Sequence, residues 1–322
     1  MSQSPPDTKS ATRTSQLEGK TVSLVLGSGA ARGLAHIGVI RELLVAGLEI
    51  KAIAGSSMGA LIGGIHAAGA MEDYAEWVSQ LDRSDVLSMA DWTLSGGLIR
   101  GRKIINKLEA LTGDVQIEAL PVEFTAVAVD LDSGRERWLD RGRLFDAIRA
   151  SIAIPGIFTP HTYRGRTLVD GGLLNPVPVA PTLRCVTDLT IVVDVNGPSQ
   201  YPSPLEPEGN RQGQDQADSE PSMMDRIRDW VDSFSSKEGG KGNDNIAQPG
   251  LLATMSRSLD IMQAAITRHH LALFTPDLVI SVPKNICMVH EFYRAADIIK
   301  LGERLTHQAL AEFRPRTNGW RD

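Results

Sequence analysis

A strand, a glycine turn and a helix follow one another twice near the start of the chain, and this order most constrains the fold. The β-branched apolar run "TVSLVLG" (21–27) leads into residues 30–47, where apolar side chains recur at helical spacing until Gly47. "AIAG" (52–55) is a second short strand, which passes through Ser57 into another helix. Because strands that alternate with helices pair in parallel, the pattern predicts a sheet with helices on its faces.

Five later apolar runs extend this sheet, and two helical stretches, 251–274 and 290–313, bracket the last of them. We therefore expect an α/β protein with a mainly parallel central sheet flanked by helices. Residues 21–198 are predicted to form its core, and 251–322 to complete it as a helix-strand-helix unit. The runs lie at 122–130, 135–139, 167–172, 189–196 and 277–282.

Two polar segments interrupt or precede the periodic pattern. Residues 1–20 have no apolar core of signal-peptide length and are predicted to be a disordered leader. Residues 199–250 form a polar insert, within which 222–234 has its apolar side chains on one helical face. That short amphipathic helix is predicted either to dock on the core or to make peripheral contact with a membrane.

Composition excludes several classes of function. The formal net charge of −6 over 322 residues gives no support to a nucleic-acid partner. Cys185 and Cys287 are far apart and lack metal-ligand spacing, so we expect neither a disulfide framework nor a bound metal. No run approaches the ~20 apolar residues of a membrane span. These features favour a cytoplasmic protein, peripheral at most to the inner membrane face.

The glycine loop "GSGAARG" (27–33) presents backbone amides to an anion at a helix N-terminus. A dinucleotide-binding site would also need an acidic residue at the end of the second strand, but that strand ends in "GSSMG". Glu49 precedes the strand and cannot easily serve. The loop is better suited to the oxyanion that forms when a nucleophile adds to an ester carbonyl, and no cofactor is then expected.

The second turn fits that chemistry. Gly55-x-Ser57-x-Gly59 has the form of a nucleophile elbow, a turn so tight that its flanking positions need glycine. It would hold the Ser57 hydroxyl at the C-terminal edge of the sheet. The alternative is an N-cap hydroxyl that satisfies a free amide of the helix.

A base for Ser57 is offered by "LVDGG" (168–172), where Asp170 follows a short strand and precedes Gly171 and Gly172. The alternative is a turn aspartate, which is common before glycine. His36 and His66 have apolar helical neighbours and are expected to be packed. Three later histidines have the chain order of a hydrolase triad, but Ser57 follows the second strand, which favours a Ser-Asp dyad; they are His269, His270 and His290.

Four segments together resemble the patatin-like phospholipases, in particular the bacterial subgroup similar to neuropathy target esterase: "GSGAARGLAHIGVI", "GSSMGAL", "RASIAIPGIFTP" (149–160) and "DGG". The resemblance covers the chain after about residue 20. It implies a three-layer patatin-like fold and hydrolysis of acyl esters in phospholipids or lysophospholipids, without histidine or metal. Ser28 stands where the subgroup usually has glycine.

Carried over by position, the resemblance makes Ser57 the nucleophile and Asp170 the general base. The amides of Gly29, Ala30, Ala31 and Arg32 form the oxyanion hole. Two alternatives stay open: a non-catalytic regulator that keeps the fold and binds a protein partner, and an acyltransferase. The motif glycines are Gly27, Gly33, Gly55, Gly59, Gly171 and Gly172.

Overall fold

The computed structural model describes residues 17–91, 99–201, 203–205 and 251–314. Its centre is an eight-stranded sheet in the order β5-β6-β3-β2-β1-β7-β8, with β4 paired to β3. The strands β3, β2, β1, β7 and β8 are parallel to one another, whereas β4, β5 and β6 run antiparallel to their partners. The predicted mainly parallel α/β sheet is confirmed.

Most strand bounds agree with the predicted apolar runs to within two residues, but β2 begins three residues early, at Glu49, which therefore lies in the strand and does not precede it. Among the described strands, β5 alone has no counterpart in the sequence prediction. It consists of three residues at the sheet edge, none of them fully buried, so no apolar run marks it. The bounds are β1 Thr21–Leu26, β2 Glu49–Ser56, β3 Glu123–Asp130, β4 Arg135–Leu139, β5 His161–Tyr163, β6 Arg166–Asp170, β7 Leu189–Gly197 and β8 Leu278–Pro283.

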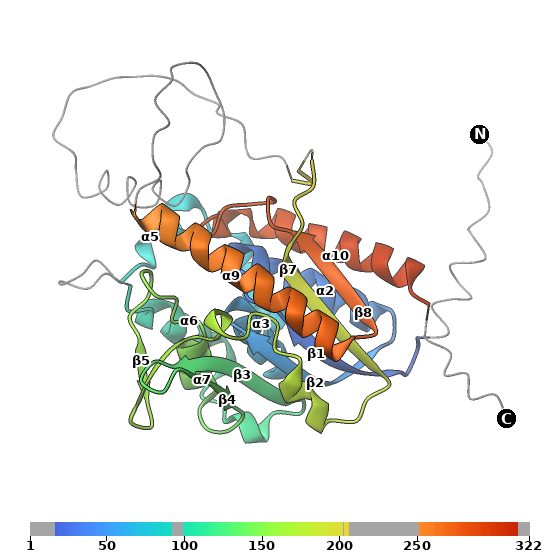
Figure 1. Ribbon diagram of the computed structural model, residues 1–322, viewed down its shortest axis with the longest axis horizontal. Coiled ribbons are helices and arrows are strands. Elements are labelled where there is room, and N and C mark those ends of the chain that lie inside the picture. The colour runs from blue at the N-terminus through green and yellow to red at the C-terminus, as the bar shows by residue number, and fades with distance from the viewer. Residues whose placement is uncertain (1–16, 92–98, 202, 206–250, 315–322) are drawn as a thin grey trace, which may run out of the picture.

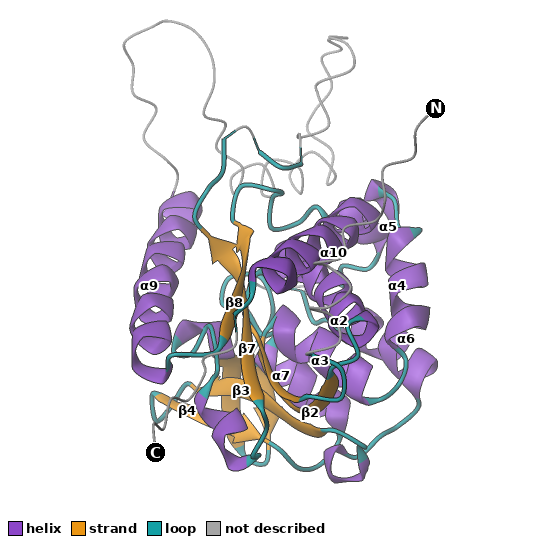
Figure 2. Ribbon diagram, turned by 90° about the vertical axis from the view of Figure 1, so that its right-hand side faces the viewer, coloured by secondary structure: helices purple, strands orange, loops and turns teal. Residues whose placement is uncertain are grey.

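Helices cover both faces of the sheet (Figures 1 and 2). Seen edge-on in Figure 2, α9 lies on one side and α2, α3, α4, α6 and α10 lie on the other, which gives three layers. The α-helices are α2 Ala35–Val45, α3 Met58–Ala67, α4 Met71–Ser79, α5 Arg83–Ser88, α6 Arg102–Thr112, α7 Leu144–Ser151, α9 Leu251–Phe274 and α10 Ala295–Glu312.

The alternation of side chains along β1 explains the two covered faces. Val22, Leu24 and Leu26 belong to the large core beneath α2 and α3. Val25 points the other way, into a smaller cluster with Leu271 and other apolar residues beneath α9. A strand that is buried on both faces has apolar side chains at almost every position, so the run "TVSLVL" is typical of a central parallel strand.

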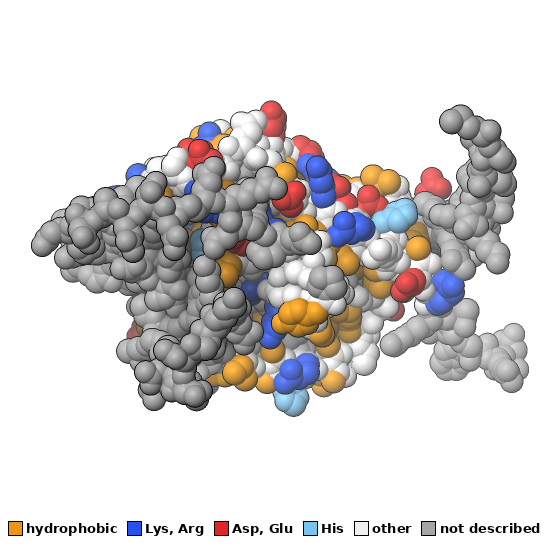
Figure 3. Space-filling view, turned by 90° about the horizontal axis from the view of Figure 1, so that it is seen from above, with side chains coloured by type: hydrophobic (Ala, Val, Ile, Leu, Met, Phe, Trp, Pro, Cys, Tyr) orange, Lys and Arg blue, Asp and Glu red, His pale blue; other side chains and the backbone are white. Residues whose placement is uncertain are grey.

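Short 3-10 helices lie at several loop ends, two of them beside the site discussed below. Gly47 ends the first helix–turn unit with φ 78°, as predicted. On the uncovered part of the surface in Figure 3, acidic, basic and apolar side chains are interspersed. The 3-10 helices are η1 Ala30–Leu34, η2 Ile117–Ala119, η3 Gly171–Leu173, η4 Ala180–Arg184 and η5 Phe292–Arg294.

The predicted domain boundaries fall largely outside the described residues. Most of the leader and of the polar insert lies there, including the predicted amphipathic helix at 222–234. Residues 17–20 are described, and Leu17 is buried in the large core. Among the described helices, none has the length and apolar character needed to cross a bilayer.

Candidate active site

Ser57 occupies a strained turn between β2 and α3. Its backbone has φ 54° and ψ −123°, a combination that non-glycine residues rarely adopt. The turn has room only for glycine at its two flanking positions. A Cβ on Gly55 would lie 2.4 Å from the Ala60 amide nitrogen, and a Cβ on Gly59 would lie 2.0 Å from the Leu26 carbonyl oxygen. Gly59 thereby holds the start of α3 directly against the end of β1.

Strand pairing brings Asp170 to the same point. One edge of β3 is occupied by β4 over 126–130, so the other edge pairs first with β2 and then with β6. On that second edge Ser56 pairs with Val127, and Asp170 pairs with the next residue, Ala128. The ends of β2 and β6 therefore abut along β3, and Ser57 meets Asp170 where β2 leaves the sheet.

The Asp170 carboxyl is buried, with its residue 4% exposed. Burial raises its pKa to about 6, while the Ser57 side chain and the Gly172 amide favour the charged form and partly oppose this shift. Gly172 N donates to Oδ1 at 2.7 Å. Oδ2 has no hydrogen-bond partner among the described residues. A carboxylate with this pKa can take up a proton near neutral pH.

The glycine loop after β1 leaves two amides free. Ser28 N donates to Pro176 O at 2.9 Å, and Ala31 N donates to Val289 O at 3.3 Å. The amides of Gly29 and Ala30 donate no hydrogen bond within the described part of the chain. Of the four amides predicted as oxyanion donors, that of Ala31 is thus occupied, and those of Gly29 and Ala30 are candidates to donate to a ligand.

Backbone strain in this loop falls on Ala30, not on Ser28. Ala30 has φ 44°, whereas Ser28 is absent from the described non-glycine residues with positive φ. The serine that departs from the subgroup pattern is therefore accommodated without a left-handed backbone. The two strained residues, Ala30 and Ser57, each follow the end of one of the paired strands β1 and β2, and such strain collects at functional sites.

Ala30→Gly should relieve this strain. A left-handed backbone costs a non-glycine residue about 1 kcal/mol, so the free energy of unfolding should rise by about that amount. Chemical denaturation of the wild type and the variant would measure the change. As a control, Ala68→Gly at the C-terminal end of α3, where φ is −81°, should destabilise; equal effects of both substitutions would contradict the strain at residue 30.

Arg32 and His36 fix the loop from behind. Arg32 Nη2 donates to Asn196 Oδ1 at 2.7 Å and Nη1 donates to Lys284 O at 3.3 Å, so its guanidinium joins the loop to β7 and the end of β8. His36 Nε2 lies 2.8 Å from Gly27 O, and burial lowers the pKa of His36 to about 4. At neutral pH this uncharged histidine donates to the loop carbonyl.

Segment 149–160 supports the site from α7 onward, and Ser151 is a site residue that sequence reasoning did not single out. Ser57 N donates to Ser151 Oγ at 2.9 Å, and Ser151 Oγ donates to Val127 O at 2.6 Å. The hydroxyl thus lies between β2 and β3 where the next ladder hydrogen bond would form. Asp170 N donates to Ala153 O at 3.0 Å, which ties both candidate residues to this segment.

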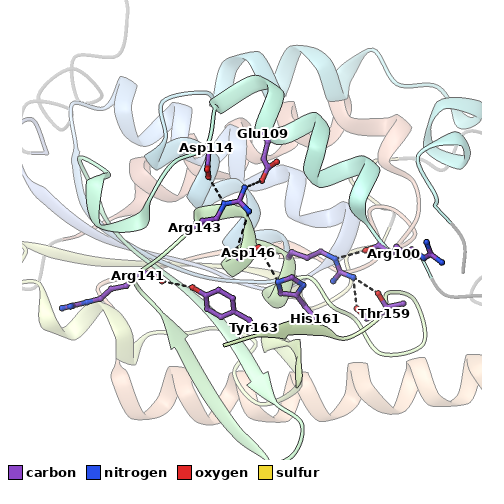
Figure 4. A network of polar contacts seen from close by, with 10 residues as sticks. Arg100, Glu109, Asp114, Arg141, Arg143, Asp146, Thr159, His161 and Tyr163 are labelled. Atoms are coloured by element: carbon purple, nitrogen blue, oxygen red, sulfur yellow. Dashed lines mark hydrogen bonds and ion pairs between the residues drawn. The ribbon is translucent and has the colours of Figure 1, made fainter. Parts of the chain in front are cut away.

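Arg149 holds the same segment in place. Its guanidinium donates to Arg100 O, to Thr159 O and to the Thr159 hydroxyl, at 2.8 to 2.9 Å. Figure 4 shows Arg143 and His161 in contact with acidic side chains nearby. The role of Arg149 is structural, because its hydrogen bonds go to Arg100 and Thr159 and not to Ser57.

Ser151→Ala should lower kcat markedly and change the melting temperature little. The variant leaves the Ser57 amide without its partner, so the strained turn loses one restraint and kcat should fall by about tenfold. Ser151→Thr keeps the hydroxyl and should retain more activity. Steady-state hydrolysis of a soluble ester, with thermal melts of both variants, measures these effects. Wild-type kcat in Ser151→Ala would contradict the positioning role.

The remaining histidines have contacts of other kinds. His270 on α9 lies 3.4 Å from Val177 O, and His269 is exposed on the same helix. No histidine contributes to the pKa of Asp170. Within the described ranges, no three His, Cys, Asp or Glu side chains form a group that could hold a metal ion.

Comparison with known proteins shows the family of this chain. The family model described as patatin-like phospholipase matches residues 24–183. An uncharacterised NTE family protein of Mycobacterium bovis is 38% identical over 330 residues, covering 91% of this chain and 92% of that protein. The chain belongs to the patatin-like phospholipase family.

Two more distant matches complete the comparison. The lysophospholipase nte1 of Emericella nidulans is 30% identical over 187 residues, which is 56% of this chain and 12% of that protein. The crystal structure of VipD from Legionella pneumophila aligns with 91% of this chain and 67% of its own, at a TM-score of 0.42 and 13% identity. Membership of the family supports a lipid hydrolase, and the fold is the α/β fold predicted from the sequence.

Proposed function

We propose that this patatin-like protein is a serine lipid acyl hydrolase of the phospholipase A or lysophospholipase type, acting through Ser57 and Asp170. The observation that carries the proposal is the meeting of β2 and β6 on one edge of β3. It sets a strained serine beside a buried carboxyl whose pKa burial raises to about 6. The lysophospholipase name of one relative supports the substrate class.

In the proposed mechanism, the Asp170 carboxylate takes the proton from Ser57 Oγ as Oγ attacks the acyl carbonyl. The negative charge that forms on the carbonyl oxygen is stabilised by the free amides of Gly29 and Ala30. The start of α3 adds the positive end of its dipole at Ser57. Collapse of the intermediate breaks the ester C–O bond, and Asp170 returns the proton to the leaving alcohol.

Deacylation repeats these steps with water as the nucleophile. Asp170 takes a proton from the water, which attacks the acyl carbon, and the proton then passes to Ser57 Oγ as the fatty acid leaves. If an alcohol replaced water in this half of the cycle, the product would be a new ester. The acyltransferase alternative therefore differs only in the acceptor and uses the same residues.

The test is labelling with a fluorescent fluorophosphonate, which reacts with activated serine. Wild-type protein should be labelled and should hydrolyse a short-chain ester, and Ser57→Ala should lose both with nearly unchanged melting, since the loss of one hydroxyl creates no large cavity. Ser88→Ala, on exposed α5, is the matched control and should behave as wild type. A folded wild type that neither labels nor hydrolyses would favour the non-catalytic regulator instead.

Lipid specificity and location follow as further parts of this proposal. Product analysis by mass spectrometry after incubation with phospholipid and lysophospholipid vesicles would identify the class that is cleaved. We expect the protein to act in the cytoplasm, at the inner membrane face.

Deletion of 222–234 should then reduce vesicle binding without affecting hydrolysis of a soluble ester.

A further inference from the structure

The hydroxyl of Ser28 is a buried polar group that the mechanism above leaves unused. Ser28 is 3% exposed. Its amide donates to Pro176 O, and its carbonyl accepts a 2.6 Å hydrogen bond from Asn196 Nδ2, so both backbone groups are fixed. Its Oγ, however, is fully buried without a hydrogen-bond partner among the described residues. Buried hydroxyls almost always have partners, so this one calls for an explanation.

A candidate acceptor is the carboxyl of Asp170. A Cβ placed on Gly172 would lie 2.8 Å from Ser28 Oγ and 2.9 Å from Asp170 Oδ1, so both oxygens border the same small space. Asp170 Oδ2 is also buried without a partner. A donor that lacks an acceptor therefore borders the same space as the Asp170 carboxyl, whose second oxygen lacks a donor, and glycine at 172 keeps that space open.

Charged side chains do not set the charge state of Asp170. Its pKa depends on burial, Ser57 and the Gly172 amide, with no contribution from a charged group of the described chain. The charged groups on the surrounding elements have other partners. Arg137 and Arg166 bind Asp130, Arg149 binds Thr159, Arg32 binds Asn196, and Asp194 accepts from the Asn196 amide. A neutral donor is thus the group able to favour the carboxylate.

We propose that Ser28 is a positioning residue whose hydroxyl donates to the Asp170 carboxylate and keeps the base ionised and correctly oriented. Rotation about the Ser28 Cα–Cβ bond is the movement required, while the backbone stays fixed. A hydrogen bond to the charged form lowers the pKa of an acid. This inference rests on the proposed function of Asp170 as general base and adds a residue that controls when that base is active.

The pH dependence of ester hydrolysis tests the proposal. In Ser28→Ala the acidic limb of the kcat/KM profile should move to higher pH by about 1 unit. The variant loses the hydrogen bond that lowers the pKa of Asp170, so burial raises that pKa further. Ser28→Gly removes the same hydroxyl and should show the same shift.

Ser56→Ala is the matched control. Ser56 Oγ is likewise buried without a partner, but it lies against Gly171 and, by strand alternation, on the opposite face of the sheet from Asp170. The acidic limb of the kcat/KM profile of Ser56→Ala should stay at the wild-type pH. Equal shifts in Ser28→Ala and Ser56→Ala, or no shift in either Ser28 variant, would overturn the proposal.

A direct measurement separates this inference from the proposed function. Carbon-13 NMR of aspartate-labelled protein, with the Asp170 carboxyl signal assigned through Asp170→Asn, follows that carboxyl whether or not any ester is cleaved. Its titration midpoint should be higher by about 1 unit in Ser28→Ala than in wild type. An unchanged midpoint refutes the hydrogen bond even if hydrolysis is normal. A raised midpoint without hydrolysis refutes the proposed function alone.

Discussion

Asp170→Asn is expected to abolish ester hydrolysis and, at pH 8, to raise the melting temperature. Asparagine keeps the shape of the side chain but cannot take the proton of Ser57, so kcat should fall by at least about a thousandfold. A variant that only damaged the fold would lose activity and melt lower. The opposite direction of the two changes therefore separates a catalytic carboxylate from a structural one.

The gain in stability follows from the pKa of Asp170. The folded protein binds the proton more tightly than the unfolded chain, with a pKa of about 6 against an ordinary value of 3.8. The contribution of Asp170 to the stability of the wild type is therefore greatest below pH 3.8, and it is lost as the pH rises through about 6. At pH 8 the ionised carboxylate costs at most about 3 kcal/mol, which asparagine avoids.

Melting curves at pH 4 and pH 8 check this sign. The difference between Asp170→Asn and wild type should amount to several degrees at pH 8 and become small at pH 4. His36, whose pKa is lowered to about 4, acts in the opposite sense in both proteins, so the difference between them isolates Asp170. A variant that is less stable than wild type at pH 8 would contradict the conclusion that burial of the ionised Asp170 carboxylate destabilises the folded protein.

Sequence predicted the sheet and the two turns because each depends on local patterns. Apolar runs such as that of β3 place a strand to within a residue, and the glycines at 55 and 59 mark a turn that side chains would block. The family resemblance was confirmed by the comparisons with known proteins. The proposed roles of Ser57 and Asp170 stay predictions until they are tested.

What sequence could not predict depends on long-range pairing. Nothing in the order of strands says that β6 follows β2 along the same edge of β3, which is how Asp170 reaches Ser57. Ser151 had no local signal because its importance lies in two backbone partners 94 and 24 residues away. Likewise, Ser28 is the residue that departs from the family pattern, but the positive φ falls on Ala30, two residues later.

Gly59→Ala is expected to have the largest effect on folding, because the added methyl meets backbone and not a movable side chain. Its Cβ would lie 2.0 Å from Leu26 O and 2.5 Å from the carbonyl carbon, so α3 could not pack on β1. We expect a loss of more than about 4 kcal/mol, seen as insoluble or unfolded protein.

Gly64→Ala, in the same helix, is the matched control for this effect. Its Cβ would meet the side-chain ends of Ile148, Leu144 and Phe124 at 2.9 to 3.1 Å. Those groups can shift, and alanine favours the helix by about 1 kcal/mol, which offsets part of the crowding. Circular dichroism and denaturation of both variants should therefore show a folded Gly64→Ala beside an unfolded Gly59→Ala. If Gly59→Ala were folded and labelled by the fluorophosphonate, the close contact between the serine turn and β1 would not be required for the site, and the steric argument for the second glycine of the motif would fail.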